Sequence, residues 1–532
     1  MEKYNIPRAK TPESVGVSST EIVEFLRDME ENKLEFHSFM IVRNGKVAAE
    51  CFRAPFTADT PHAQYSVSKT FTSVAVAFAV DEGFFSLDTL LVDIFPEYVR
   101  GKKDKKLEKL TIRHLITMTA GKSVNILADK SKTDWIESFF NCPWYAAPGE
   151  EFRYTNENIY MLSAAVKKTT GLSLRDFLGP RLFEPLSIET PFWETDNEGV
   201  EAGGWGSYFK TEDLAKLMLC FAGDGKLNGK QILPEGWVKE ASAPISDNSF
   251  CTDLDAKQGY GYCLWRNGGC KQSYRADGMF SQFGLVFEEY DAVVVVTSGI
   301  ADEQEARDCI WRHFPKAFIE PHNGKTAIPK LKEILSLSPI DLPAVSGHSP
   351  LETKIEGKKI KVRKKIFLNL IGFPVSVMPL AVTYMTTDKA GNFNDFMFSF
   401  RENECTVSWV EGDEYNSIVC GMDGHQRYGT MVLGKISYLV CCTALWLNDN
   451  ELLISIRPVT TVAKRCLRFK FKAGGKVDIF PSSTPDSTDI AYVLANSCGD
   501  LIRNTFLHKL AKRALLLIPH LVDSKHRGRI TD

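Results

Sequence analysis

The sequence predicts an α+β domain followed by a separate all-β domain, and three observations carry this prediction. β-prone runs lie near both ends of the first 320 residues with helical patterns between them, which is typical of an antiparallel sheet with a helical insert. Prolines then recur at positions 321, 329, 339, 343 and 350, as in a linker. After them, short alternating runs divided by turn residues indicate a β-barrel or a sandwich.

The length of the chain requires more than one hydrophobic core. A chain of 532 residues exceeds the size at which single cores stop growing. We therefore expect a first domain over residues 1–320, a linker over 321–350, and an all-β domain over 351–532 that ends in helices. The 44% apolar and 25% charged residues are typical of a folded globular protein, and the formal charge of −3 provides no general attraction for nucleic acid.

The expected elements of the first domain follow from turn residues and apolar spacing. Two strands within residues 36–52 flank Asn44-Gly45, the pair that suits a type I′ hairpin turn. Apolar residues three to four apart predict the helices, and Thr211 is a candidate N-cap for the last helix of the insert. The expected helices cover 69–82, 111–119, 158–170, 174–178, 211–222 and 302–318, and two further strands cover 284–288 and 292–298. Beyond the linker, strands should fill residues 352–482, and one or two amphipathic helices should fill 490–522.

Ser66 and Lys69 form the first candidate pair of chemical groups. They stand three residues apart at the start of a predicted helix, so both side chains lie on one face, one turn apart. A serine hydroxyl becomes a good nucleophile only when a neighbour accepts its proton, and a lysine can do so if its pKa falls toward neutrality. By itself the S-x-x-K spacing is a weak signal, because a solvated helix start gives the same pattern.

Tyr154 and Asn156 form the second candidate pair. They follow the turn PGEEFR and precede a predicted helix. A phenol beside an ammonium group is stabilised as phenolate, so Tyr154 is a candidate to take the Ser66 proton and pass it to the leaving group. Asn156 is a candidate to hold Lys69 and to donate to the substrate carbonyl region. The competing interpretation is that Tyr154 packs and Asn156 caps the helix.

These segments resemble the serine β-lactamases of class C, the D-alanyl-D-alanine carboxypeptidases and related esterases and D-aminopeptidases. The resemblance covers about residues 8–318 and includes YSVSKTFTS, FSLDTLLVDIFPEY, LTIRHLITMTAG, PGEEFRYTN and GGWGSYFKTEDLAKLM. It implies a β-lactamase/transpeptidase-like first domain. The all-β part resembles the lipocalin-like domains attached to some D-aminopeptidase-type and peptide-cyclising relatives.

The third element of the family departs from its usual form. Relatives carry Lys or His, then Thr or Ser, then Gly on an edge strand, whereas this chain has Ala276-Asp277-Gly278. The cation that helps to orient a substrate carboxylate is missing, although Arg275 is a candidate for a displaced positive charge. Gly278 should allow a ligand to approach the strand closely, and the backbone N–H groups of Met279 and Ser66 are the candidate oxyanion donors.

The expected function is acyl transfer to water through an acyl-enzyme on Ser66, with Lys69 and Tyr154 as a proton relay and with no metal or cofactor. An ester or amide substrate is favoured over β-lactamase or D-alanyl-D-alanine carboxypeptidase chemistry. A catalytically idle ligand-binding protein is the alternative from another class, and the oligomeric state cannot be read from the sequence.

Two further expectations concern the cellular environment. The first residues lack an apolar segment behind a basic start, which predicts a cytoplasmic protein. The thirteen cysteines have no CxxC pairing and should be reduced and largely buried, without metal. A basic tail that contacts a membrane surface is a weaker expectation than a solvated helix face, and it rests on Lys509, Lys512, Arg513, Lys525, Arg527 and Arg529.

Overall fold

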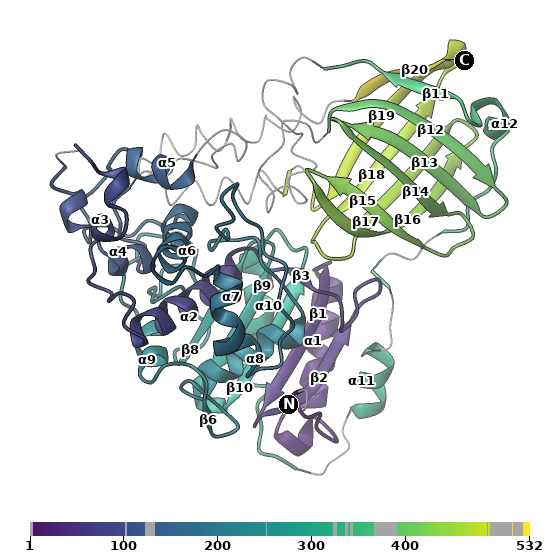
Figure 1. Cartoon of the computed structure of the whole chain (residues 1–532). Helices are drawn as coiled ribbons and strands as arrows, with labels where there is room; N and C mark the ends of the chain where they lie inside the picture. Colours follow the sequence, from purple (N-terminus) through teal and green to yellow (C-terminus); the bar gives the residue numbers. More distant parts are fainter. Residues whose placement is uncertain are drawn as a thin grey trace. The chain divides into compact units, whose positions relative to one another are not determined.

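The computed structural model describes two compact units, which divide near residue 338 (Figure 1). The described residues are 4–101, 104–122, 134–251, 253–322, 327–335, 339–340, 344–365, 391–486, 488–489, 513 and 525–531. The expected helices over 490–522 lie outside these residues, apart from Arg513. In the described part of the chain, no helix is long and apolar enough to cross a bilayer.

The first unit is built on a six-stranded antiparallel sheet with the order β2-β1-β10-β9-β8-β7. Asn44 and Gly45 have φ angles of 51° and 67°, so the predicted type I′ hairpin is confirmed. Because β1 pairs with β10, the two ends of the domain meet in the middle of the sheet, as the α+β prediction requires. The strands are β1 (Phe36–Arg43), β2 (Lys46–Phe52), β7 (Trp265–Arg266), β8 (Ser273–Gly278), β9 (Gln282–Phe287) and β10 (Ala292–Ser298).

Helices cover both faces of this sheet, which explains why every residue of β10 is buried. Val293 and Val295 of β10 join the core formed with helices α2 (Ser68–Asp81), α6 (Asn156–Thr170) and α8 (Thr211–Ala222). Their neighbours Val294 and Val296 join the core on the opposite face, because successive side chains of a strand point to opposite sides. That second core includes residues of α1 (Ser19–Glu31), α10 (Glu303–His313) and α11 (Ile328–Leu335).

The helical insert contains every helix predicted for it, but α4 ends at Ile116 instead of 119, three short helices were not predicted, and one cap differs. The N-cap of α8 is Lys210 and not Thr211. The backbone N–H of Lys210 donates to Asp213 Oδ2 at 3.1 Å. The Thr211 hydroxyl instead bonds the Ser38 hydroxyl at 2.6 Å, so tertiary packing removed it from the capping role. The remaining helices are α3 (Leu91–Ile94), α4 (Ile112–Ile116), α5 (Trp135–Asn141), α7 (Leu174–Leu178) and α9 (Trp237–Ala241), and the short strands are β3 (His62–Ala63), β4 (Tyr208–Phe209), β5 (Lys226–Leu227) and β6 (Lys230–Gln231).

The second unit confirms the all-β prediction, since a ten-stranded sheet closes into a barrel (Figure 1). Closure is marked by a bridge between Gly421 of β14 and Thr443 of β16. The helix α12 (Glu352–Ile355) precedes the barrel, whose strands are β11 (Lys359–Val362), β12 (Phe393–Arg401), β13 (Glu404–Glu411), β14 (Glu414–Gly421), β15 (Arg427–Leu433), β16 (Ile436–Asn448), β17 (Glu451–Pro458), β18 (Lys464–Phe471), β19 (Lys476–Thr484) and β20 (His526–Thr531).

The barrel interior is apolar but contains one ion pair. Glu411 and Arg465 are each 1% exposed and bind through two contacts of 2.9 and 2.7 Å. Trp409 Nε1 and the backbone N–H of Gly391 also donate to this carboxylate. The Arg465 guanidinium holds the pKa of Glu411 below its usual value although burial raises it. Removal of either partner would therefore leave an uncompensated charge in the core.

We expect Glu411→Gln to destabilise the barrel by about 3 kcal/mol or more, because Arg465 would lose its counter-ion in a dry interior. Hydrogen exchange of the β13 and β18 amides, followed by mass spectrometry on the whole chain, measures this loss directly. The matched control is Glu451→Gln, which removes an ion pair of 2.6 Å with exposed Lys470 and should change protection little. Equal effects of the two substitutions would contradict the proposed role of the buried pair.

Candidate active site

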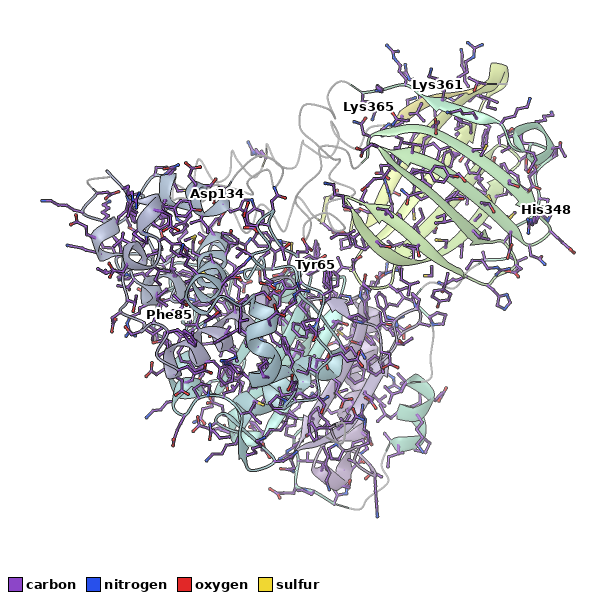
Figure 2. The ribbon with its side chains drawn as sticks, in the orientation of Figure 1. Tyr65, Phe85, Asp134, His348, Lys361 and Lys365 are labelled. Atoms are coloured by element: carbon purple, nitrogen blue, oxygen red, sulfur yellow. The ribbon has the colours of Figure 1, made fainter. Side chains whose placement is uncertain are left out.

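Ser66 lies in a single turn of 3₁₀ helix, Tyr65–Val67, that leads directly into α2. Tyr65 has a φ angle of 46°, a left-handed conformation that a bulky residue rarely adopts. Tyr65, Val67 and Ser68 are buried while Ser66 is partly exposed, so this turn presents only the serine to solvent. Figure 2 labels Tyr65, the first residue of this turn. Backbone strain at Tyr65, directly before the exposed Ser66 hydroxyl, is typical of a functional position.

Lys69 is held by three oxygen atoms. Its Nζ contacts Ser66 Oγ at 2.9 Å, Asn156 Oδ1 at 2.7 Å and the Gly204 carbonyl at 2.6 Å. The sequence-predicted residues Ser66, Lys69 and Asn156 therefore meet at one point, whereas Gly204 was not predicted. Burial lowers the pKa of the Lys69 ammonium to about 7, and the acidic neighbours Glu157 and Asp277 oppose this shift.

The contacts of Lys69 determine where its lone pair points after it loses a proton. A neutral amine has two N–H donors and one acceptor lone pair. The Asn156 Oδ1 atom and the Gly204 carbonyl can only accept, so they take the two N–H groups. The lone pair then faces Ser66 Oγ, which is the position a general base for this hydroxyl must occupy.

Two glycines of the GGWG segment allow this arrangement. A Cβ atom on Gly204 would lie 2.9 Å from the Asn156 carbonyl oxygen, and one on Gly203 would lie 2.9 Å from the Ile159 carbonyl oxygen. Both distances are shorter than an ordinary carbon–oxygen contact, so only glycine lets this segment approach α6. The Gly203 carbonyl also accepts from the Thr72 hydroxyl of α2 at 2.9 Å. The segment thus joins α2 and α6 at Lys69, and the glycine pair was the sequence signal for it.

Tyr154 lies beside Lys69, with the Lys69 Nζ atom 4.7 Å from the centre of its ring. Burial raises the pKa of Tyr154 well above its usual value, while a side-chain hydrogen bond with Ser66 lowers it by less. Desolvation opposes the phenolate more strongly than its neighbours stabilise it, which favours a neutral phenol over the expected phenolate base. A neutral Tyr154 phenol can donate a hydrogen bond. The proton-relay roles of Tyr154 and Lys69 stay predictions.

Asn156 is the first residue of α6, and Thr155 is the N-cap. The helix-capping interpretation of Asn156 is therefore replaced by its contact with Lys69. The next residue, Glu157, is partly exposed. Burial raises the pKa of its carboxyl to about 7, and the nearby Lys69 opposes this shift. Glu157 is a further titratable group of the site that the sequence did not single out.

The end of β8 lies against the Ser66 turn. The two-residue edge strand β7 pairs only with Tyr274 and Arg275, so the segment from Ala276 to Gly278 is an open edge, as expected for the third element. A Cβ atom on Gly278 would lie 2.4 Å from the Gln64 carbonyl oxygen. The protein backbone itself thus requires glycine at position 278, and the close approach of a ligand to this strand stays a prediction.

Met279 follows β8 and is partly exposed, while the next residue, Phe280, is buried. The Phe280 ring packs edge-on against the Tyr65 ring, with centroids 5.5 Å apart. This contact fixes the turn after β8 relative to the Ser66 turn. The structure thereby brings the two segments that carry the candidate oxyanion donors together, and the donor role of Met279 and Ser66 remains a prediction.

Arg275 does not replace the missing cation of the third element. Its Nε donates to Asp277 Oδ2 at 2.6 Å, its Nη1 donates to Asn267 Oδ1 at 2.7 Å, and the side chain is 2% exposed. Ala276 is fully buried in the hydrophobic core. Arg307 also lies 3.5 Å from Asp277. Both guanidinium groups are therefore engaged in a buried network instead of being available to a substrate carboxylate.

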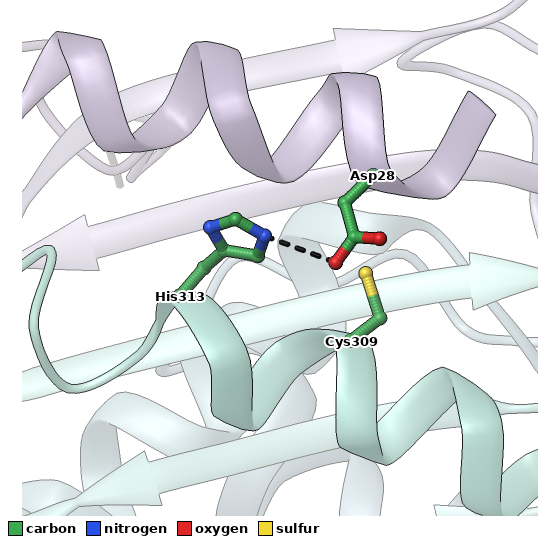
Figure 3. A group of neighbouring side chains, drawn as sticks. All are labelled: Asp28, Cys309 and His313. Atoms are coloured by element: carbon green, nitrogen blue, oxygen red, sulfur yellow. Dashed lines mark hydrogen bonds and ion pairs between the residues drawn. The ribbon is translucent and has the colours of Figure 1, made fainter. Parts of the chain in front are cut away.

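A second cluster joins α1 to α10 through Asp28, Cys309 and His313 (Figure 3). The two His313 ring nitrogens lie 2.6 Å from Glu21 Oε1 and 3.1 Å from Asp28 Oδ2. Arg312 binds both oxygens of Asp28, at 2.7 and 3.3 Å. These contacts account for the cluster as a network that joins two helices.

His62 and the described cysteines are mostly buried. His62 Nε2 bonds His37 Nδ1 at 2.9 Å, and burial lowers the pKa of His62 well below its usual value. These contacts favour a structural role for His62. All twelve described cysteines are free thiols, and only Cys466 among them is not buried.

The amino-acid sequence matches one protein family and several known proteins. The Beta-lactamase family matches residues 27–315, more than half of the 532 residues. The Beta-lactamase of Escherichia coli (strain K12) is 32% identical over 156 residues, 29% of this chain and 40% of that protein. The 6-aminohexanoate-dimer hydrolase of Paenarthrobacter ureafaciens is 24% identical over 316 residues, 55% of this chain and 80% of that enzyme.

A solved structure of a penicillin binding protein from Bacillus halodurans is 20% identical, with a TM-score of 0.42 over 54% of this chain and 99% of that one. The chain spans 57% of an uncharacterised protein of Alkalihalophilus pseudofirmus, to which it is 29% identical. It spans 40% of the length of the Escherichia coli enzyme, so it covers about half the length of these two curated relatives.

We expect Gly278→Ala to lower kcat by roughly tenfold or more, because the new Cβ would displace the β8 end from the Ser66 turn and misplace an oxyanion donor. The assay is p-nitrophenyl ester hydrolysis. The control is Gly179→Ala in the same unit, where a Cβ meets nothing within 4 Å. Activity equal to that of the control variant would show that this close packing does not position the site.

Proposed function

The chain belongs to the β-lactamase family, and on that premise we propose that it hydrolyses an ester or amide through an acyl-enzyme on Ser66. The observation that carries the proposal is the contact of 2.9 Å between Ser66 Oγ and a desolvated Lys69 whose other two contacts are acceptors. Relatives in this family that are named as hydrolases support the same class of chemistry.

In the first step, Ser66 Oγ attacks the carbonyl carbon and its proton moves to Lys69 Nζ. The tetrahedral intermediate then collapses, the bond from carbon to the leaving oxygen or nitrogen breaks, and the leaving group takes up a proton. The neutral Tyr154 phenol, which shares a hydrogen bond with Ser66, can donate this proton and recover one from the Lys69 ammonium. Water attacks the acyl-enzyme by the reverse route, and Ser66 regains its proton.

The oxyanion of both intermediates requires two backbone donors. The N–H groups of Ser66 and Met279 are the proposed pair, and the packing of Tyr65 on Phe280 supports their preorganisation. Donors that are held before the substrate arrives need no reorganisation during the reaction, so the buried aromatic contact contributes to the rate without touching the substrate.

The third element favours a substrate without an essential carboxylate. Ala276 is buried in the core, and Arg275 is bound to Asp277 and Asn267, so neither offers a free positive charge. We therefore rank an ester or amide above a penicillin or a D-alanyl-D-alanine peptide. The relative named 6-aminohexanoate-dimer hydrolase supports a substrate outside the β-lactam class.

Ser66→Ala should abolish labelling by a fluorophosphonate and lower p-nitrophenyl ester turnover by at least about a thousandfold, because it removes the oxygen proposed to form the acyl bond. The matched control is Ser249→Ala, an exposed serine of the same unit. If the wild type forms no adduct and releases no more nitrophenol than Ser66→Ala, the chain is a ligand-binding protein and the enzyme proposal fails. A chromogenic cephalosporin and D-amino-acid amides, assayed beside the esters, test the ranking of substrates.

We expect kcat/KM to rise with pH through about 7 and to fall below it, because Lys69 accepts the Ser66 proton only in its neutral form. The sign follows from the direction of the shift, since burial lowers the pKa of the ammonium and makes the free amine available near neutrality. A pH profile of ester hydrolysis measures this limb. A flat profile from pH 5.5 to 8.5 would remove Lys69 from the role of base.

Glu157→Gln should move this acidic limb to lower pH by roughly half a unit, because loss of the carboxylate removes a charge that raises the Lys69 pKa. The measurement is the same pH profile, with exposed Glu235→Gln as the control. A limb that stays in place or moves upward would show that Glu157 does not act on Lys69.

A further inference from the structure

The outer surface of three neighbouring barrel strands carries an unbroken group of cations. Lys361 of β11 stands directly opposite Arg529 of β20, and Arg529 stands directly opposite Lys476 of β19. Figure 2 shows Lys361 on the outside of the barrel. The exposed side chains of this group, which we name the basic face, are Lys359, Lys361, Arg363, Lys476, Arg527 and Arg529.

Strand alternation explains why the charges share one side. Ile360 and Val477 are 0% and 1% exposed and belong to the barrel core, so their neighbours Lys361 and Lys476 must point outward. Cross-strand partners bring their Cβ atoms within about 5.5 Å of each other. The row formed by Lys476, Arg529 and Lys361 therefore places three like charges side by side, which destabilises the sheet unless an anion lies against it.

The carboxylates near the basic face are already occupied. Asp395 binds Lys359 at 2.6 Å, and Asp478 binds Lys472 at 2.5 Å and Lys525 at 3.2 Å. Lys472 and Lys525 are themselves exposed cations at the margin of the face. Asp395 of β12 stands opposite Lys361 in the register, but its carboxylate binds Lys359. Within the described ranges, Lys361, Lys476 and Arg529 form no ion pair with a carboxylate. Their charge is thus available to an external polyanion.

The sequence beside the basic face distinguishes a lipid surface from a nucleic acid. Strand β11 and residues 363–365 lead directly into residues 366–387, which contain no charged side chain and are mainly apolar. Met397 of β12, opposite Lys359 in the register, is 42% exposed. Basic residues immediately next to apolar chain match the headgroup and acyl layers of an anionic bilayer. A nucleic acid offers no apolar phase of this kind.

We propose that the basic face binds the surface of a lipid bilayer that contains anionic phospholipids. The interaction does not depend on the proposed hydrolase chemistry, since no residue of the basic face belongs to the Ser66 site. It would hold the protein at a surface where acyl esters are abundant. The interaction is electrostatic at the basic face, so it should weaken as ionic strength rises.

The test is flotation of the full chain with vesicles of phosphatidylcholine alone and with vesicles that also contain about 30% phosphatidylserine. We expect binding to the anionic vesicles and loss of that binding in high salt. The double variant Lys361→Glu with Arg529→Glu should lower the partition coefficient by at least about thirtyfold, because it reverses two charges in the centre of the face.

The control is Lys435→Glu with Arg401→Glu, which reverses an exposed lysine and an exposed arginine elsewhere on the barrel and should bind like the wild type. Ester hydrolysis by all three proteins reports whether the first unit is intact, and circular dichroism reports on the barrel. Failure of the wild type to float with anionic vesicles would overturn the proposal. Equal flotation of the two double variants would also overturn it. So would a double-stranded oligonucleotide that binds the protein more tightly and displaces it from the vesicles.

Discussion

Desolvation of Lys69 is the constraint on which the catalytic unit depends. An ammonium group buried in protein needs either a counter-ion or a low pKa, and this one has neutral oxygen partners at Asn156, Gly204 and Ser66. Three chain segments must therefore converge on a single nitrogen atom. The glycines at 203 and 204 and the first turn of α6 serve this convergence, so the same contacts join the helical insert and prepare the base.

The two units treat buried charge differently. In the first unit, Arg275, Arg307 and Asp277 form a buried network at the segment where a free cation was expected. In the barrel, Glu411 and Arg465 compensate each other inside an apolar core. On the outside of the barrel, Lys361, Arg529 and Lys476 face each other across strands. The buried ion pairs stabilise the fold, whereas the exposed cations of the basic face are available to a partner.

Local sequence patterns were sufficient where neighbours along the chain decide the structure. Asn44-Gly45 predicted the hairpin because only its backbone angles suit a type I′ turn. The spacing of Ser66 and Lys69 placed them one helical turn apart, and the alternating runs after residue 352 predicted the barrel strands. Strand β20 (His526–Thr531) lies beyond the predicted strand region of 352–482.

The sequence by itself determined the fold class and the candidate group of Ser66, Lys69, Tyr154 and Asn156, because these depend on local geometry and on motifs that resemble a family. Tertiary structure alone decided that burial favours the neutral Tyr154 phenol, that Gly204 and Glu157 lie beside Lys69, and that Arg275 is bound by Asp277. Each of these depends on desolvation or on contacts between distant segments. Neither quantity is contained in the spacing of residues along the chain.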